Sequence, residues 1–423
     1  MKTAVVTVGL GFGDEGKGAT VDYLCRSLGA DLVVRYCGGS QAAHNVVLPD
    51  GRRHIFSQFG AGTLAGVPTY IGPEVVVNPT ALAREAEHLV GLGVADPFGM
   101  LTAHPSALVT TFFHQSLNRL REVARGDGRH GSCGHGIGEA RNGWLRHGSD
   151  AVIASDLLDG RVLRRKLELL RQRTLLDVQA FAHKVPPTDR EEAGLLEISS
   201  AAVAERLLEI GRQIRLDADV PDCELAVFEG AQGVLLDEWH GFHPHTTWST
   251  VTAHHALELA REAGAASLTT LGVTRAFTTR HGAGPLPTYD AALTARITDP
   301  GNPWNRWQEG MRVGWLDLVL LRYASAVLGP LDGLAVTWLD QAEEVKLCTS
   351  YGGCSVPTPP VKPDLAGQEA LNRALGEAVP VYQSVSREEL LAALEKVAPV
   401  VIEAYGATHL DRKSRLAGGV TSR

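Results

Sequence analysis

The sequence predicts an α/β fold with a mainly parallel central sheet flanked by helices. Short β-branched apolar runs recur along the chain and end in glycine-containing or polar turns, which is typical of buried parallel strands. Segments with helical spacing of apolar residues lie between these runs. The 423 residues could form two or three average domains, but single α/β units with insertions also reach this length. We predict one domain over residues 1–423 with inserted helical and loop segments.

The first predicted unit is a strand, a loop and a helix followed by a second strand. Residues 4–8, AVVTV, favour a buried strand that ends at glycine. After the loop, Val21, Leu24 and Leu28 share a helical face, and DLVVRY from Asp31 predicts the next strand. Further strands are expected at residues 225–230, 268–273, 334–340 and 399–406. Because ligands of parallel sheets gather at the carboxyl ends of strands, we expect the functional residues there.

Helices are predicted between the strands, at residues 117–124 and 386–398. The second begins with Ser386 and Glu389 in a capping-box pattern, and Val385 and Leu390 can form a hydrophobic staple.

Two other stretches are interpreted as surface features. Residues 161–182 are rich in Arg and Leu and could form a phosphate or nucleic-acid stripe, but a solvated helix face is the better interpretation. Residues 356–364, VPTPPVKPD, are too short for a domain linker and predict a surface excursion.

Composition and charge restrict the function classes. The formal net charge of −8 and the pI near 6.1 provide no global positive field for nucleic acid or an anionic membrane, although a local basic pocket stays open. The six cysteines contain no CxxC pair, which favours reduced thiols and a cytoplasmic location. We find no long apolar segment typical of a signal peptide and no run of about 18 apolar residues typical of a membrane span.

Residues 9–18, GLGFGDEGKG, contain most of a phosphate-binding loop. Gly11, Gly16 and Lys17 have Walker A spacing, but Gly18 stands where that loop needs Ser or Thr to hold magnesium. The glycines let backbone amides approach an oxyanion, and the following helix points its positive end at the same place. Asp14 would be costly among such amides unless it binds a metal or takes a proton. The loop therefore indicates a phosphate site with its own chemistry.

The stretch RYCGGSQAAHN, residues 35–45, would by itself indicate only a glycine-rich loop with one histidine. Together with the upstream loop, it resembles the adenylosuccinate synthetase family, whose members carry GDEGKGK followed by RYQGGxNAGHT. Further ordered matches occur at residues 125–141, 228–250, 272–288, 314–322 and 344–348. The resemblance implies a P-loop-NTPase-like synthetase fold and a ligase that joins aspartate to inosine monophosphate. Such enzymes use GTP and magnesium to activate the purine oxygen as a phosphate ester, giving adenylosuccinate, GDP and phosphate.

The resemblance also implies roles for individual residues. Asp14 would take the N1 proton of a 6-oxopurine nucleotide, and His44 and Lys17 would act on the transferring phosphoryl group. The implied catalytic residues are Asp14, Lys17, His44 and Gln232. The implied GTP-binding residues are Gly13, Glu15, Gly16, Lys17, Gly18, Ala43, His44, Asn45, Trp338, Asp340, Tyr405 and Gly406. The implied purine-nucleotide residues are Asp14, Lys17, Gln41, Ser132, Cys133, Arg146, Gln232 and Thr247, and the implied magnesium ligands are Asp14 and Ala43.

The segment TWLD, residues 337–340, matches the family's base-reading TKLD. A carboxylate at Asp340 can accept two hydrogen bonds, from N1–H and the exocyclic amine of guanine, which adenine does not offer. Trp338 stands at the lysine position, where an indole could stack on the base.

The largest departure from the family pattern is NRWQEGMRVGW, residues 305–315. The family has TTGRxRRxGW here, a clamp for the carboxylates of aspartate. The corresponding amine-substrate loop of this chain carries Arg306, Glu309, Met311 and Arg312. An anion in place of a cation opposite a dicarboxylate costs about 2–5 kcal/mol of affinity. One alternative is therefore a paralogue with the same phosphoryl transfer but another amine or purine, and a second is a guanine-nucleotide-binding protein without catalysis.

The expected partners are small molecules and a second copy of the chain. The substrates are GTP, a purine monophosphate and an amino acid or other amine, with no nucleic acid or membrane partner. Arg146 matches a family arginine that reaches the nucleotide of a partner subunit, which implies a homodimer. His240, His243 and His245 could suggest zinc, but no cysteine or carboxylate completes convincing ligand spacing. The resemblance places His243 and His245 at family tyrosine positions beside the nucleotide, so we interpret the three as loop histidines.

Overall fold

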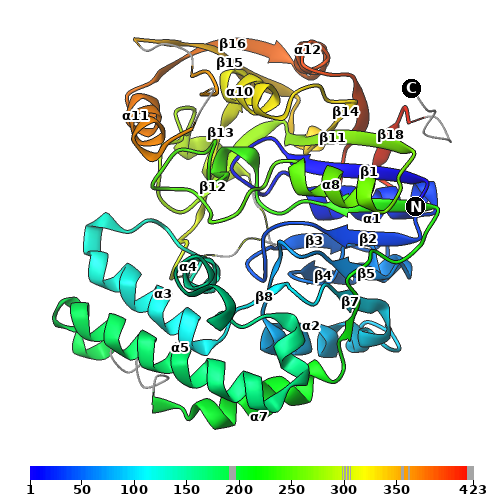
Figure 1. Cartoon of the computed structure of the whole chain (residues 1–423). Coiled ribbons are helices and arrows are strands. Elements are labelled where there is room, and N and C mark those ends of the chain that lie inside the picture. Colours follow the sequence, from blue (N-terminus) through cyan, green and yellow to red (C-terminus); the bar gives the residue numbers. More distant parts are fainter. Residues whose placement is uncertain are drawn as a thin grey trace.

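Ten strands form the central sheet of the computed structural model, which describes residues 1–189, 197–297, 299, 302, 304, 306–353, 357–360 and 363–416 (Figure 1). Across the sheet these are β18 (Arg412–Ser414), β17 (Val400–Ala404), β14 (Gly333–Thr337), β11 (Ser267–Arg275), β1 (Thr3–Gly9), β10 (Leu225–Glu229), β2 (Leu32–Arg35), β5 (Thr69–Ile71), β7 (Leu101–Ala103) and β9 (Arg215–Leu216). Every pairing in this sheet is parallel except that of β17 with β18. The predicted mainly parallel sheet is confirmed.

A second sheet, which the sequence pattern did not predict, lies beside the first. It consists of β12 (Phe277–His281), β13 (Met311–Asp317), β15 (Glu344–Gly352) and β16 (Val379–Ser386), with antiparallel pairs at both ends. Two short pairs complete the strands: β3 (His44–Val47) with β4 (Arg53–Phe56), and β6 (Val76–Val77) with β8 (Leu108–Val109). Part of the predicted surface excursion at 356–364, and Cys354, lie outside the described residues.

Helices cover both faces of the central sheet. They are α1 (Lys17–Leu28), α2 (Pro79–Gly91), α3 (Phe112–Arg125), α4 (Ile137–His147), α5 (Gly160–Phe181), α7 (Ser200–Gly211), α8 (His254–Glu262), α9 (Ala291–Arg296), α10 (Leu318–Leu328), α11 (Leu365–Gly376) and α12 (Arg387–Leu394). Figure 1 shows α3, α5 and α7 as a helical layer beside the sheet, where α5 packs on the other two. Exposed arginines of α5, such as Arg161 and Arg165, agree with a solvated face. No helix among the described ranges is long and apolar enough to cross a bilayer.

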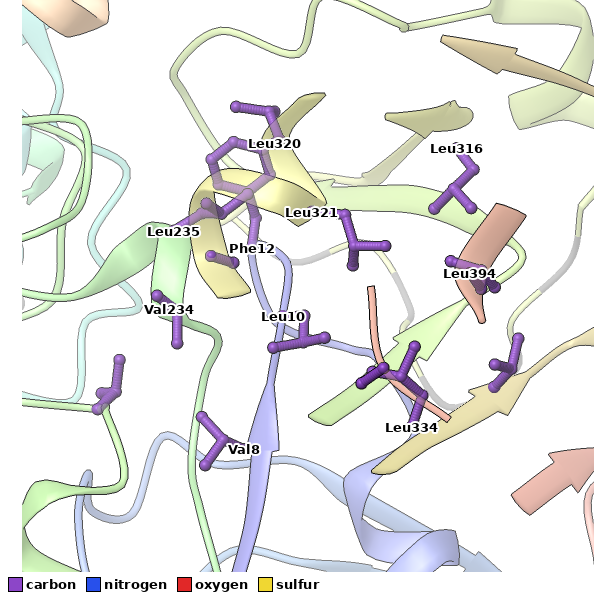
Figure 2. Packing of buried hydrophobic residues seen from close by; sticks show 14 of the residues in the cluster. Val8, Leu10, Phe12, Val234, Leu235, Leu316, Leu320, Leu321, Leu334 and Leu394 are labelled. Carbon is purple, nitrogen blue, oxygen red and sulfur yellow. The ribbon is translucent and has the colours of Figure 1, made fainter. Parts of the chain in front are cut away.

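The two largest of the three core clusters lie on opposite faces of the sheet, because successive residues of a buried strand point to opposite faces. Val6 and Val8 of β1 join the cluster that contains α10, whereas Val5 joins the cluster that contains α1. Figure 2 shows Leu10 and Phe12, from the loop after β1, packed in the first cluster with neighbours that include Leu235 and Leu320. The packing of Leu10 and Phe12 therefore fixes the path of the loop where it leaves β1.

Two element boundaries differ from the prediction. The strand expected to run to residue 340 ends at Thr337, because Trp338 adopts a left-handed backbone with φ of 60°. The helix expected to reach residue 398 begins with the predicted capping box but ends at Leu394. The carbonyl of Leu394 accepts the amides of Val397 and Ala398, and Pro399 then disfavours a helical conformation at Ala398.

Candidate active site

A cavity of about 780 Å³ opens where β1, β10, β11 and β14 end. Its lining comes mainly from the segments that follow these strands, from the β2–β3 connection, and from residues 130–133 and 243–248, with further residues of α3, α4, β4 and the chain before β13. The expectation that the functional motifs meet at the carboxyl ends of the strands is confirmed. Segments far apart in the sequence thus share one enclosure large enough for small-molecule ligands.

Glu15 folds back into the glycine-rich loop. Its carboxylate accepts hydrogen bonds from the amides of Gly11 (3.0 Å) and Gly13 (2.8 Å) and pairs with Lys17. The side chain is buried and lies outside the lining of the cavity, although the sequence placed it among the GTP-binding residues. Two of the amides expected to face a phosphate therefore face this internal carboxylate, because buried amides need an acceptor.

The missing hydroxyl of the Walker A pattern has a packing explanation. A Cβ on Gly18 would lie 2.6 Å from the Cβ of His44, which is closer than carbon atoms approach in proteins. The first turn of α1 thus packs directly against the start of β3, and Ser or Thr at this position would push His44 away. Gly18 brings the two segments together and supplies no ligand oxygen from a side chain.

Asp14 lies at the tip of the same loop with φ of 60°, a left-handed conformation that is uncommon outside glycine. Its side chain lines the cavity and is 18% exposed. The Oδ2 atom lies 3.2 Å from Nε2 of His281, the last residue of β12. The loop therefore holds one carboxylate inward, on Glu15, and turns the neighbouring carboxylate toward the ligand space.

His44 is held by a buried carboxylate that the sequence reasoning missed. Its Nδ1 pairs with Glu229, and the other oxygen of Glu229 accepts the amide of Ala61 at 2.9 Å. Burial lowers the pKa of His44 despite the neighbouring carboxylate. For Glu229, burial opposes ionisation, but Arg35 and His44 outweigh it and lower the pKa of the carboxyl. Both pKa shifts are explained by a neutral imidazole of His44 that donates Nδ1–H to the ionised carboxylate of Glu229.

Trp338 and Asp340 both line the cavity, in the turn that follows β14. The Arg275 guanidinium lies 3.6 Å from the centre of the Trp338 ring and 3.0 Å from a carboxylate oxygen of Asp299. One face of the indole is therefore already covered by a cation. Gly406 also lines the cavity, whereas the Tyr405 hydroxyl donates to a carboxylate oxygen of Glu403, 2.6 Å away.

Sixteen of the predicted site residues line the cavity. They are Gly13, Asp14, Gly16, Lys17, Gly18, Gln41, Ala43, His44, Asn45, Ser132, Cys133, Gln232, Thr247, Trp338, Asp340 and Gly406. Gln232 has φ of 53°, and its buried Oε1 has no hydrogen-bond partner among the described residues. Burial raises the pKa of the Cys133 thiol to about 11, so this cysteine is a neutral lining group.

The four residues predicted to bind the amine substrate do not line the cavity. Arg312 donates to the carbonyl oxygens of Gly282 (2.6 Å) and Gly284 (2.8 Å). Arg306 pairs with Asp189, and Glu309 is exposed with φ of 59°. These residues and Met311 lie outside the lining. The sequence match aligned these positions with the clamp, but the arginines have acceptors elsewhere, and His281, Ala283 and Gln308 line the cavity in their place.

Arg146 also lies outside the main cavity, on an exposed part of α4 beside a small pocket that α5 shares. This position leaves open a contact with a second copy of the chain. His243 and His245 line the cavity as loop histidines, and the grouping with metal-ligand spacing in the described part of the chain is His254, His255 and Glu258 on α8, away from them. The missed residues Glu229 and His281 share one signal: each is a polar residue that ends a buried strand.

These features define a nucleotide-using α/β enzyme in which a lysine-bearing phosphate loop and a carboxylate face one ligand cavity. The adenylosuccinate synthetase family model matches residues 6–404. An adenylosuccinate synthetase from Neisseria gonorrhoeae is 33% identical over 361 residues, which cover 83% of this chain and 81% of that protein. One from Synechococcus sp. is 36% identical over 366 residues, with 82% and 78% covered. The chain belongs to the adenylosuccinate synthetase family and is a GTP-dependent ligase that forms a carbon–nitrogen bond.

Solved structures with the same fold agree with this assignment at low sequence identity. A fully ligated adenylosuccinate synthetase from Plasmodium falciparum has a TM-score of 0.74 at 19% identity, with 97% of this chain and 99% of that chain covered. A succinoaminodeoxyadenylate synthetase of cyanophage S-2L, bound to dGMP and dATP as an energy donor, has a TM-score of 0.60 at 17% identity, with 98% and 95% covered. Both likenesses concern the fold.

Proposed function

We propose that the protein activates inosine monophosphate at O6 with GTP and then joins an amine to carbon 6. The observation that carries this proposal is the position of Asp14, a carboxylate turned into the cavity from a loop whose other acid is internally satisfied. Asp14 would accept the N1 proton, so that O6 gains the electron density needed to attack the γ-phosphoryl group.

Lys17 and His44 would act on the phosphoryl group. Lys17 lines the cavity at the start of α1, where the helix N-terminus favours negative charge. Glu229 orients the imidazole of His44 by accepting Nδ1–H. As charge builds on the leaving phosphate, the ring would take up a second proton, and Nε2–H would then donate to a phosphate oxygen. Gln232 is a fourth lining residue with an amide for the purine.

The residues around Asp14 fit magnesium. A cavity-facing carboxylate and the backbone carbonyl of the exposed Ala43 offer the hard oxygen ligands that Mg²⁺ takes together with substrate phosphates. When bound there, the ion would neutralise phosphate oxygens. Asp340 would select guanine as the donor base, with the open side of Trp338 beside it.

A homodimer and a cytoplasmic location complete the proposal. Arg146 is exposed on α4 beside Trp144 and Leu145, which are 48% and 66% exposed, and this apolar surface supports association with a second copy. The partner's Arg146 would then add a cation to the nucleotide phosphate. Five described cysteines are free, which supports a reducing compartment.

The test is Asp14→Asn. It removes the proton acceptor with little change in shape, and we expect phosphate release from GTP with inosine monophosphate and an amine to fall by about 10³-fold or more. Calorimetry should find the GTP dissociation constant within about threefold of the parent, since Lys17 and the loop are intact. Turnover that survives the change would refute Asp14 as the base. GTP binding by the parent without turnover under any of these conditions would instead favour a non-catalytic nucleotide-binding protein.

A further inference from the structure

Arg280 of β12 is a buried cation in the lining of the cavity, where it is 1% exposed. Two other arginines of the lining have carboxylate partners: Arg121 pairs with Glu139, and Arg275 pairs with Asp299. In the described part of the chain Arg280 has no such partner. Burial lowers the pKa of its guanidinium to about 9, so the group is still a cation at neutral pH. Because a buried charge without a counter-ion is unfavourable, an anion that enters the cavity can be stabilised here.

The protein satisfies part of the hydrogen-bonding capacity of this guanidinium. Nη1 of Arg280 donates to the carbonyl of Pro285 at 2.7 Å, and Nη2 donates to the carbonyl of His245 at 3.4 Å. The Phe12 ring covers one face of the group, with its centre 4.1 Å from Cζ. A guanidinium has five N–H donors, and the buried Nε has no hydrogen-bond partner among the described residues. The two carbonyls and the ring therefore fix the plane of the group and leave N–H donors for an oxyanion.

The groups around Arg280 are also basic. Arg312 stands opposite Arg280 in the register of β12 with β13, and like charges at opposite positions of a sheet repel. His245 lines the cavity, and burial, with Arg280 adding to it, lowers the pKa of its imidazole. The cavity carboxylate Asp14 lies 3.2 Å from His281, the next residue along β12, and successive residues of a strand point to opposite faces. The surroundings of Arg280 therefore favour a negatively charged ligand group.

Gly284, in the loop after β12, provides the space that the guanidinium occupies. A Cβ on Gly284 would lie 2.2 Å from Nη2 of Arg280 and 3.0 Å from the Cβ of His245, and the φ of Gly284 is +106°. The carbonyl of Gly284 accepts a hydrogen bond from Arg312 at 2.8 Å, which holds the loop in this course. The protein thus positions the guanidinium beside the cavity by its own packing, before a ligand arrives.

We propose that Arg280 is a substrate-binding residue that takes an anionic oxygen group of a ligand in the cavity. The inference rests on the proposed function, whose substrates offer two such groups besides those of GTP: the phosphate of inosine monophosphate and a carboxylate of the amine. Both groups present paired oxygen atoms, which a guanidinium binds with two parallel N–H donors. The phosphate loop would hold the phosphates of GTP, so the affinity for GTP should not depend on Arg280.

Arg280→Met tests the proposal, because it removes the cation and keeps an unbranched side chain over Phe12. Phosphate release is measured with GTP and inosine monophosphate, and with hydroxylamine, alanine or aspartate as the amine. We expect the KM of a substrate that bears the bound anion to rise by about tenfold or more, with the GTP KM within about threefold. A rise for inosine monophosphate with every amine, including hydroxylamine, identifies the phosphate. A rise for an amino acid, with hydroxylamine kinetics within about threefold of the parent, identifies the carboxylate.

Arg312→Met separates ligand binding from support of the loop, because Arg312 bonds to the same loop but lies outside the cavity lining. Arg280→Met should raise the KM in question by about fivefold or more above its value in Arg312→Met. Equal rises in the two variants, or KM values of Arg280→Met within about twofold of the parent, overturn the inference and leave the proposed function intact. No turnover by the parent with any of the amines refutes the proposed function and the inference with it.

Arg280→Lys replaces Arg280→Met if the methionine variant does not fold. Lysine keeps the charge but lacks the planar fork, so the same KM should rise by about threefold or more. A KM within about twofold of the parent would overturn the inference, provided that the lysine variant melts at the temperature of the parent.

Discussion

Charged side chains have different kinds of partner on the two sides of the cavity. On the phosphate-loop side, buried carboxylates are matched within the protein: Glu15 by Lys17 and loop amides, and Glu229 by His44. On the β12 side, cations donate to backbone carbonyls: the buried Arg280 to that of Pro285, and the half-buried Arg312 to that of Gly282. The first arrangement fixes side chains that would act on a phosphoryl group, and the second fixes the course of a loop. An arginine that a sequence motif keeps can therefore bind a backbone carbonyl in place of the substrate group that the motif implies.

Glu229→Gln is expected to have the largest effect, because it weakens the hydrogen bond that orients His44 on the phosphate-loop side. An amide cannot hold Nδ1–H of His44 as firmly as a carboxylate, so we expect kcat to fall by about 10–100-fold with the GTP KM within about threefold. Steady-state phosphate release with the proposed substrates measures both constants. The matched control is Glu224→Gln, where the carboxylate pairs with Lys2 at the surface. A kcat within twofold of the parent would exclude an orienting role for Glu229.

Gly18→Ser restores the Walker A hydroxyl and tests how closely the phosphate loop packs against His44. Its Cβ would collide with His44, so we expect a loss of about 1–3 kcal/mol in the free energy of unfolding and lower turnover. Denaturant unfolding provides the measurement. Gly91→Ser is the control, because a Cβ there meets nothing within 4 Å and φ is not left-handed. Unchanged stability together with faster turnover would mean that the loop has room for a Walker-type hydroxyl.

Asp317→Asn tests the pH dependence of stability on the β12 side of the cavity and has the smallest expected effect. Asp317 is buried at the end of β13, and burial raises the pKa of its carboxyl to about 6. Because the folded state holds this proton more tightly than the unfolded state, stability is gained as pH falls below about 6 and lost as pH rises from about 4 to about 6. Asparagine keeps the N-cap of α10 and removes this titration.

The measurement for Asp317→Asn is the melting temperature at pH 5 and pH 7.5. The difference in melting temperature between parent and variant should shift by about 1–2 °C in favour of the parent at the lower pH. Parallel melting curves at the two values would contradict a raised pKa at this position.

Local patterns predicted the parts of the fold that depend on neighbouring residues. The strand at β1, the helix at α1 and the capping box at Ser386 follow from apolar spacing and side-chain hydrogen bonds close in sequence. The second sheet was missed because β13 pairs with β12 and β15 across long connections, and no local pattern records such a register. The end of β14 was misplaced because Trp338 adopts a backbone conformation that the sequence does not signal.

The candidate site shows the same division. Motif matches placed Asp14, His44, Gln232 and Asp340 in one cavity, since their positions follow from the ends of parallel strands. They could not reveal that Glu15 turns inward or that Arg312 bonds to the Gly282 loop, because both outcomes depend on which acceptor lies nearest in space. Whether the lining residues carry the proposed roles stays a prediction.

The inward Glu15 has a consequence for the thermodynamics of nucleotide binding. Its carboxylate acts as a built-in surrogate anion, so the backbone torsions of the loop are fixed during folding and need not be fixed when a nucleotide arrives. Binding then loses little conformational entropy at the loop, and more of the contact energy remains as affinity. The loop is preorganised by its own sequence.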